Sequence, residues 1–544
     1  MHSVNVARKA RLAVACLLGA TALTPLGVAA QVWIGATSDY AMASNWNPAS
    51  VPGASSGIAT FGATGTSTVS LSASSVGTFQ FDSTAQAYTF SGGMTFSGGG
   101  IVGNFSTAQT FSNGTYNFRN SATASNATLS FTNAIVNFND ASGAQAANIN
   151  LNASFVYAFS GYLRDGKISL DNGSLVQIVG ASTGGTEFVT VDGGSTVLVT
   201  YGGSIGSIAG PGTLNIQNPA DVGGNNKSTS FSGTILAFSN RLTKVGTGIW
   251  TLSGANTITD QTVIAGGLIN FSALANFGTG RVVLNGGGVQ WAAGNTIDIS
   301  PRLDPIGSSG GTFDTNGNNV TLGTGISGGG GITKAGSGTL TLTGVNTYQG
   351  GTTINAGTIS VAANNNLGSG ALAFGGGTLQ TMASFAMLRA TTLNSGGTFD
   401  VASGTTLTHG GVIGGTGGLT KTGGGTLVLT AVNTYQGGTT INAGTLELSD
   451  SGSIASSSLV DLAAAGASFD ISPSTINQTI QDLRGVAGSR VRLGDNSLTL
   501  GTANSTTFAG IVDAGPFGLG TGGLIKQGSG TLTLTGANTY TGGT

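Results

Sequence analysis

The chain has 544 residues, including 96 glycines, and a formal net charge of −2. Charged residues make up 7% of the sequence, against roughly 25% in an average soluble protein, while hydrophobic residues make up 39%. A disordered chain would be more charged and less apolar, and nucleic-acid binding would need a basic stripe that is absent outside the N-terminus. The composition favours a folded, glycine-rich protein, with a low-complexity Gly/Ser/Thr polymer as the alternative.

The first 30 residues have the plan of an export signal peptide. Three basic residues within 8–11 precede an apolar stretch over residues 12–23, and small residues lead up to Ala30. This plan predicts cleavage after Ala30, and the apolar stretch is too short to span a bilayer as a retained helix. The single cysteine, Cys16, lies in the signal, so the mature chain would contain no disulfide.

Residues 31–53 follow the signal and contain two tryptophans, Trp33 and Trp46. We expect these residues to form an N-terminal cap, because the first strand of a stacked fold has an open edge that needs a cover. Stacking of the two indole rings on a sugar is the alternative. Residues 54–230 are rich in strand-like segments but carry no diagnostic motif.

The mature chain consists of short strands separated by turns. In the segment GTLTLTG, Leu340 and Leu342 would face one side and the threonines between them the other, which is the period of a half-buried strand. Glycine-rich and Asn-Ala-Gly turns close each strand. Short strands repeated along a chain favour a β-solenoid, in which each coil covers the edge of the next.

Residues 231–544 carry four copies of one phrase, at about 242–268, 332–358, 419–445 and 524–544, and the last copy stops with the chain. The clearest copy is ITKAGSGTLTLTGVNTYQGGTTINAGT. The lysines that begin the copies are separated by 90, 87 and 105 residues. This spacing predicts a module of roughly 90 residues, or about four coils of the solenoid. The lysines are Lys244, Lys334, Lys421 and Lys526.

Two polar positions of the phrase invite a functional interpretation. Asn346, Asn433 and Asn538 share an Asn-Thr-Tyr motif, and we expect each to stabilise a local turn, because equivalent residues several coils apart cannot stack as a ladder. We expect Lys334 and its equivalents to mark solvated strand starts and not a ligand site.

Candidate catalytic residues are scarce. His409 is the only histidine after His2, and a Cys–His pair is impossible in the mature chain. Ser204 and Ser327 each lie in a G-x-S-x-G motif, but that motif needs a following helix, and so many glycines make accidental matches common. The sequence therefore predicts no catalytic, cofactor-binding or metal-ligating residue.

Two clusters of charged residues remain. The segment Arg164-Asp165-Gly166-Lys167 is typical of an Asp-Gly hairpin turn. The second cluster is interpreted as a solvated face of the solenoid, and it comprises Asp482, Arg484, Arg490, Arg492 and Asp495. A β-helical polysaccharide lyase or hydrolase would need clustered carboxylates or a calcium site with a nearby base, so either cluster could serve such an enzyme.

The repeated phrase Lys-x-Gly-x-Gly-Thr-Leu-x-Leu-Thr-Gly-x-Asn-Thr-Tyr-x-Gly-Gly-Thr resembles the passenger-associated transport repeat of autotransporters, the type V secretion proteins of Gram-negative bacteria. Three copies match closely, and the copy at 242–268 departs from the pattern with Ile258 in place of tyrosine. The resemblance implies an all-β fold: a right-handed parallel β-helix with no helical domain after the signal peptide. It also implies export through the periplasm to the cell surface, or secretion.

The resemblance further implies a partner, an outer-membrane β-barrel translocator that lies C-terminal to the passenger. No barrel sequence is present up to Thr544, so we expect this domain downstream in the same polypeptide. We expect a non-enzymatic rod whose repeats support folding and secretion, with adhesion to glycans or proteins of a host or cell surface as a possible role. A polysaccharide-degrading enzyme exported by the same route is the alternative. A third interpretation is a structural stalk with a functional head in residues 54–230.

Overall fold

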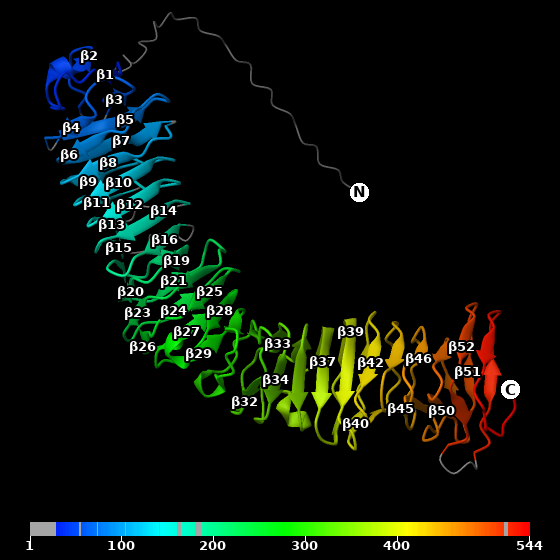
Figure 1. The fold of residues 1–544 in the computed structure, drawn as a ribbon. Coiled ribbons are helices and arrows are strands. Elements are labelled where there is room, and N and C mark those ends of the chain that lie inside the picture. Colours follow the sequence, from blue (N-terminus) through cyan, green and yellow to red (C-terminus); the bar gives the residue numbers. More distant parts are fainter. Residues whose placement is uncertain are drawn as a thin grey trace, which may run out of the picture.

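A computed structural model describes residues 29–53, 56–72, 74–103, 105–140, 142–159, 165–179, 187–515 and 520–544. The predicted signal peptide, apart from its last two residues, lies outside the described residues. The rest of the chain winds into a β-solenoid of about 22 turns, which Figure 1 shows as one long bent rod. The predicted all-β solenoid is therefore confirmed. None of the helices among the described residues is long and apolar enough to cross a membrane.

Two sheets form the first half of the rod. Successive coils add strands to each of them, and all their pairings are parallel except the one between β1 and β2. The first sheet has the order β2 (Trp46–Asn47), β1 (Gln31–Trp33), β3 (Ile58–Phe61), β5 (Ser74–Phe81), β7 (Met94–Gly103), β9 (Thr115–Phe118), β11 (Ile135–Phe138), β13 (Phe155–Phe159), β15 (Leu175–Val179), β17 (Thr196–Thr200), β20 (Thr213–Ile216), β23 (Thr234–Ala237) and β26 (Thr257–Ile258). The second has the order β19 (Ser207–Ala209), β16 (Phe188–Val191), β14 (Lys167–Asp171), β12 (Asn148–Asn152), β10 (Thr128–Thr132), β8 (Gln109–Ser112), β6 (Thr89–Ser91) and β4 (Thr68–Ser70).

Two further sheets carry the rod through its middle and along the second half. The shorter one has the order β18 (Ser204–Ile205), β21 (Ala220–Val222), β24 (Leu242–Lys244), β27 (Thr262–Ile264) and β29 (Val282–Leu284). The longer one has the order β22 (Thr229–Phe231), β25 (Ile249–Leu252), β28 (Leu268–Phe271), β30 (Gly288–Trp291), β31 (Gly311–Asp314), β32 (Val320–Leu322), β33 (Ile332–Ala335), β34 (Thr339–Leu342), β35 (Thr352–Ile354), β36 (Thr358–Val361), β37 (Leu372–Thr381), β39 (Thr391–Val401), β41 (Ile413–Gly414), β42 (Leu419–Thr422), β44 (Thr439–Ile441), β46 (Val460–Leu462), β49 (Leu483–Gly485), β52 (Thr506–Phe508) and β55 (Leu532–Leu534).

The last two sheets complete the C-terminal arm. One has the order β38 (Phe385–Met387), β40 (Thr406–His409), β43 (Thr426–Leu429), β45 (Thr445–Leu448), β47 (Ser468–Asp470), β50 (Arg490–Arg492) and β53 (Ile511–Asp513). The other has the order β48 (Gln478–Thr479), β51 (Leu498–Leu500) and β54 (Leu524–Lys526). Four short 3-10 turns interrupt the strands of the solenoid: η1 (Ala43–Asn45), η2 (Leu274–Phe277), η3 (Ser300–Arg302) and η4 (Asn364–Asn366).

The core is a continuous column of side chains that runs along the rod axis. Because parallel coils pair in register, the same strand position recurs one coil further on, roughly 4.8 Å away. In the N-terminal arm this places Phe90, Phe111 and Phe131 in a stack, with ring centroids 5.0 and 5.3 Å apart. The alternation of apolar and polar residues seen in the sequence therefore sorts each strand into a core face and an outer face.

The N-terminal end is closed by the antiparallel strand β2, which pairs with β1. Trp33 and Trp46 are both buried, with ring centroids 5.0 Å apart in an edge-to-face contact. Their indole nitrogens donate to the carbonyls of Thr66 and Tyr40, respectively. Because both rings lie inside the core, they are not placed to stack on a sugar. The predicted boundary between residues 230 and 231 stays a prediction, and strand pairing is continuous across it, from β20 to β23.

The rod turns through an elbow near β29–β32, between an N-terminal arm and a C-terminal arm (Figure 1). Here Arg281 pairs with Asp304 at 2.8 Å and also donates to the carbonyls of Pro301 and Leu303. Arg302, in η3, donates back to the carbonyls of the coil beneath, including that of Gly280. The loops at the elbow are therefore tied to the preceding coil by side-chain contacts.

Candidate functional site

The lysine that begins each repeat is a core residue. Lys334 is fully buried and pairs in register with Phe313 of the preceding coil and Ile354 of the following one. Its Nζ donates to the carbonyls of Ala335 and Gly336, both at 2.7 Å, and to that of Ala356 at 3.3 Å. The ammonium group thus binds carbonyls of the turn that directly follows Lys334. It also binds a carbonyl of a turn that lies 22 residues further along the chain.

The same arrangement recurs in two other copies. Lys421 donates to the carbonyls of Thr422, Gly423 and Ala443, and Lys244 to those of Val245, Gly246 and Gly266. In the last copy, Lys526 donates to Gln527 and Gly528.

The three buried lysines sit in an apolar environment that disfavours their charge. Burial lowers the pKa of Lys244, Lys334 and Lys421 to about 8. The Asp314 carboxylate, on the strand beneath Lys334, acts in the opposite direction on its pKa, and Asp400 does the same for Lys421. The expectation that these lysines mark solvated strand starts is therefore wrong.

The asparagine of each repeat joins successive coils. Asn346 accepts from the N–H of Ile326, 20 residues earlier, at 2.7 Å, and donates to the carbonyl of Asn366, 20 residues later. Asn433 accepts in the same way from Ile413 and donates to the carbonyl of Ser453. These asparagines are buried.

Asn538 in the last copy also accepts an upstream N–H, that of Val512, at 2.9 Å. The predicted local turn role is therefore wrong, because the main partners lie in neighbouring coils. The number of residues in one coil is about equal to the sequence separation between each asparagine and its partners. Backbone groups that are distant in sequence therefore lie next to each asparagine amide.

The tyrosine of the repeat is the third buried polar group. The hydroxyl groups of Tyr348 and Thr352 lie 2.6 Å apart, and those of Tyr435 and Thr439 lie at the same distance. Burial raises the pKa of Tyr348 to about 12. The copies at 332–358 and 419–445 therefore each place a lysine, an asparagine and a tyrosine inside the solenoid, all with hydrogen-bond partners.

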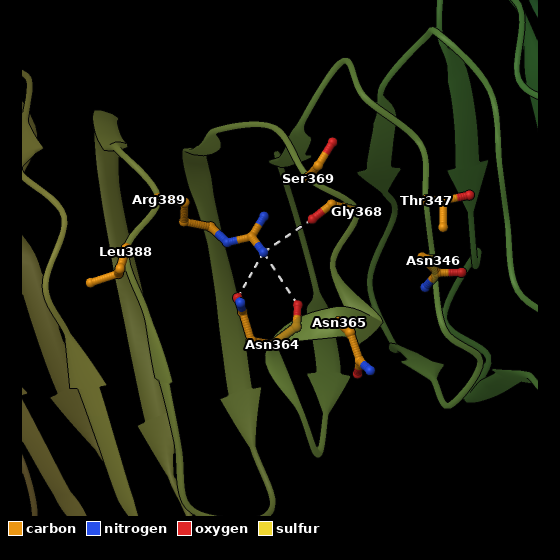
Figure 2. Close-up of a pocket in the computed structure, with 8 residues that line it drawn as sticks. All are labelled: Asn346, Thr347, Asn364, Asn365, Gly368, Ser369, Leu388 and Arg389. Carbon is orange, nitrogen blue, oxygen red and sulfur yellow. Dashed lines mark hydrogen bonds between the residues drawn. The ribbon is translucent and has the colours of Figure 1, made fainter.

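A surface groove opens beside the second repeat. It has a volume of about 660 Å³ and lies next to η4 and the turn between β38 and β39 (Figure 2). Its lining is polar apart from one leucine and one glycine, and consists of Asn346, Thr347, Asn364, Asn365, Gly368, Ser369, Leu388 and Arg389. Volumes of this order are typical of ligand-binding clefts.

Arg389 dominates the chemistry of this groove. Its Nη2 donates to Asn364 Oδ1 at 2.8 Å and to the carbonyls of Leu367 and Gly368, and its Nη1 donates to the carbonyl of Gly370. Figure 2 shows the guanidinium reaching over η4 toward Asn364 and Gly368. Sequence reasoning missed Arg389, because an isolated arginine between two strands gives no signal of its own.

The serines of the two G-x-S-x-G motifs are not placed for catalysis by a triad. Ser204 lies in β18 and Ser327 on an exposed segment, and a strand or loop follows each of them. His409 is buried, with one ring nitrogen 2.8 Å from Thr391 Oγ1 and the other 3.0 Å from the Gly411 carbonyl. Burial lowers the pKa of His409 to about 4, so the imidazole is neutral near pH 7.

The C-terminal charged residues separate into pairs between coils. Arg484 pairs with Asp461, Arg490 with Asp513 and Arg492 with Asp470. Arg484 and Arg490 are largely exposed, which agrees with the predicted solvated face.

Two members of this charged cluster differ in their setting. Asp482 is buried and accepts hydrogen bonds from Thr502 and Asn504, so it does not belong to a solvated face. Asp495, in contrast, accepts from the exposed Thr521. Among the residues that the structure describes, no group of three or more His, Cys, Asp or Glu side chains could hold a metal ion.

The segment around Asp165 forms a turn but not a hairpin. Asp165 has a φ of 55°, in the left-handed region, as a tight turn requires. The strands on either side, β13 and β14, belong to different sheets and each pairs in parallel with its neighbouring coils. The hairpin prediction is wrong because a solenoid coil turns a corner at this point. Arg164 lies outside the described residues.

The model of the passenger-associated-transport-repeat family matches the chain at four places, residues 242–269, 332–361, 419–448 and 524–544. These matches coincide with the four copies of the phrase, and the matches at 332–361 and 419–448 contain the buried lysine, asparagine and tyrosine. The repeats and the solenoid together fit an autotransporter passenger. No curated protein and no solved structure gives a significant match to the chain.

Proposed function

We propose that this chain is the exported passenger of an autotransporter, a rod that stands at the cell surface or is released from it. A β-barrel translocator in the same polypeptide would carry it across the outer membrane. The observation that carries the proposal is that the four family matches fall on the segments whose side chains form hydrogen bonds between neighbouring coils. The proposal includes no enzymatic activity.

We further propose that the repeats support secretion by making each new coil stable as soon as it forms. In a solenoid, stability is approximately a sum over neighbouring coils, so folding can proceed coil by coil. Lys334 binds a turn 22 residues downstream, and Asn346 binds groups 20 residues away on both sides. A coil held in this way resists unfolding back into the translocator, which favours outward movement of the chain.

Adhesion is the role that the outer surface supports best. Six threonines on consecutive coils pair in register and stand on the outer face of the long sheet: Thr339, Thr358, Thr378, Thr398, Thr420 and Thr440. Hydroxyl groups both donate and accept hydrogen bonds, so a row at one-coil spacing offers many equivalent weak contacts. Multivalent contact of this kind raises avidity without a deep site.

The secretion proposal is tested with Lys334→Met and Lys421→Met together, in the natural secretion setting of the full polypeptide. We expect less passenger at the surface, measured by protease accessibility on intact cells, because six carbonyl contacts are lost while a side chain of similar length still fills the core. Lys167→Met is the matched control, because Lys167 is exposed. Equal surface display of the double variant and the control would contradict the proposed role of the repeats.

The adhesive role needs a separate measurement. Cells that display the rod should attach to glycan-coated or cell-coated surfaces more strongly than cells that display a rod shortened by one whole repeat module. Release of reducing sugars from polysaccharides by the purified rod would instead favour the enzymatic alternative.

A further inference from the structure

The groove beside the second repeat contains a cation with no counter-ion. Arg389 makes its hydrogen bonds to neutral groups, namely four backbone carbonyls and the Asn364 side chain. In the parts of the chain that the structure describes, no carboxylate lies within ion-pair distance of Arg389. The arginines that do form ion pairs are Arg281, Arg484, Arg490 and Arg492.

The guanidinium also has unused hydrogen-bonding capacity. It carries five N–H groups, of which the two on Nη2 face Asn364, Leu367 and Gly368. The Nε–H is buried without a partner among the described residues, and one N–H of Nη1 faces the Gly370 carbonyl, which leaves the second N–H of Nη1 for a ligand. Figure 2 shows this terminal nitrogen turned away from Asn364, toward the side of the groove where Ser369 stands. A planar anionic group accepts well from such a donor.

The rest of the groove suits a hydroxylated ligand. Thr347, Asn365 and Ser369 are exposed and present hydroxyl and amide groups that both donate and accept. Leu388, on the other side of Arg389, is 82% exposed, the largest exposed fraction among the large hydrophobic residues that the structure describes. Figure 2 shows its side chain pointing away from the Arg389 guanidinium, so it offers an apolar surface at the edge of the groove, where a neighbouring sugar unit of an oligosaccharide would lie.

From this combination we propose that the Arg389 groove binds an acidic saccharide, with the carboxylate or sulfate of one sugar unit facing Nη1 of Arg389. The ring hydroxyls would contact Thr347, Asn365 and Ser369, and the apolar face of an adjacent sugar unit would lie on Leu388. The inference rests on the proposed surface display for its biological use, and it deepens the adhesive role by naming a site and a ligand class.

A saccharide fits the groove better than an acidic peptide. Extended peptides commonly bind by adding a strand to a free sheet edge. Beside this groove β37 pairs with β35 and β36 on one side and with β39 on the other, while β38, the end strand of its sheet, pairs only with β40 and has η4 packed near it. A peptide would have only side-chain contacts in a shallow polar groove.

The inference is tested by titration calorimetry on the purified passenger chain at low salt. The probes are an oligogalacturonate, the same oligosaccharide with its carboxyl groups reduced to alcohols, a sulfated oligosaccharide and a polyglutamate peptide. We expect binding of one or both acidic saccharides and at least tenfold weaker binding of the reduced sugar, with affinity falling as salt rises. The carboxylated and sulfated probes distinguish the two possible anions.

Variants at Thr347 test whether binding occurs in this groove, and they leave the hydrogen bonds from Arg389 to the backbone carbonyls in place. Thr347 is exposed and its side chain lines the groove, so Thr347→Glu should weaken binding of the acidic sugar about tenfold, and Thr347→Lys should strengthen it. Asn150→Glu, on an exposed strand position in the N-terminal arm, adds the same charge elsewhere and should leave the affinity unchanged. Arg389→Met should abolish binding, with far-ultraviolet circular dichroism as the check on folding.

Several outcomes would overturn the inference. They are the absence of binding by every acidic saccharide, equal affinity for the reduced sugar, an unchanged affinity in Thr347→Glu, and tighter binding of polyglutamate than of the sugars. A passenger that reaches the surface normally but binds no acidic sugar would overturn the groove assignment alone. A chain that binds the sugar but is not exported would overturn the proposed function and leave the groove assignment intact.

Discussion

Ile258 stands four residues before Thr262, and the buried hydroxyl of Thr262 has no hydrogen-bond partner among the described residues. In the three close copies a tyrosine takes the place of Ile258 and its hydroxyl contacts that of the equivalent threonine, as in the pair Tyr348–Thr352. The first repeat therefore keeps an apolar side chain at this position but has lost the group that satisfied its threonine. A buried unsatisfied hydroxyl costs about 1–3 kcal/mol.

Thr262→Val should stabilise the coils around β27 by about 1 kcal/mol, because valine has the shape of threonine without the unpaired hydroxyl. Thr352→Val should have the opposite effect at β35, since it leaves the hydroxyl of Tyr348 buried and alone. Hydrogen exchange of the flanking strands measures both, because stability in a solenoid is local. Slower exchange in Thr352→Val, or faster exchange in Thr262→Val, would contradict this account.

Asn346→Ala should destabilise the second repeat by about 1–3 kcal/mol. The substitution removes the acceptor for the Ile326 N–H and the donor to Asn366, and both backbone groups are then left without a partner inside the solenoid. Hydrogen exchange at Ile326 should quicken most. Asn365→Ala is a control on the following coil, because Asn365 is exposed.

The buried lysines predict stability that rises with pH on the alkaline side. For Lys334 the pKa is about 8 when folded and 10.5 in the reference state, so between these values the unfolded chain binds more protons. Stability then rises with pH through this window and is lowest and level below about pH 8, where both states hold the proton.

The measurement is local hydrogen exchange, corrected for its intrinsic pH dependence, between about pH 7 and 9.5 for the wild type and Lys334→Met. In the variant, stability should no longer rise with pH in the coils around β33. It should still rise with pH around β42, where Lys421 remains. An identical pH response in both proteins would show that the Lys334 ammonium is not desolvated by the core.

His409 should make the C-terminal arm sensitive to acid. Its pKa is lowered from 6.5 to about 4, so as pH falls from about 6.5 the unfolded chain takes up the proton and the folded chain does not. Stability is therefore full above about pH 6.5 and decreases down to about pH 4, by about 3 kcal/mol in total. His409→Gln should remove the pH dependence of stability around β40. An imidazole that titrates near pH 6.5 in the folded protein would contradict the lowered pKa of His409.

The architecture was predictable from the sequence because its cause is local. Residues such as Leu340 and Leu342 alternate with threonines, and glycines mark the corners, so the strand period and the repeats indicate stacked coils. The buried polar groups were not predictable in the same way. Lysine is ordinarily a surface residue, and the third carbonyl that binds Lys334 belongs to a turn 22 residues away.

A signal for the lysines was nevertheless present. In a chain with only 7% charged residues, a lysine that returns at the same place in four copies is unusual. A Phe-Asp pair also recurs ahead of two of these lysines, and the structure places Phe313-Asp314 and Phe399-Asp400 directly beneath Lys334 and Lys421. Arg389 had no such signal, because its carbonyl partners come from a turn shaped by the coils beneath it.

The elbow near β29–β32 bears on how many copies of the rod would share a surface. Straight rods of uniform width align side by side and exclude whatever lies between them. This rod is bent, and contacts such as Arg281–Asp304 stabilise the bend. A bent rod that rotates about its anchored end occupies a wider area than a straight one, so neighbouring rods in random orientations stay further apart. The surface layer that these rods form would be loosely packed. Large polymers could then enter it and reach the sides of each arm.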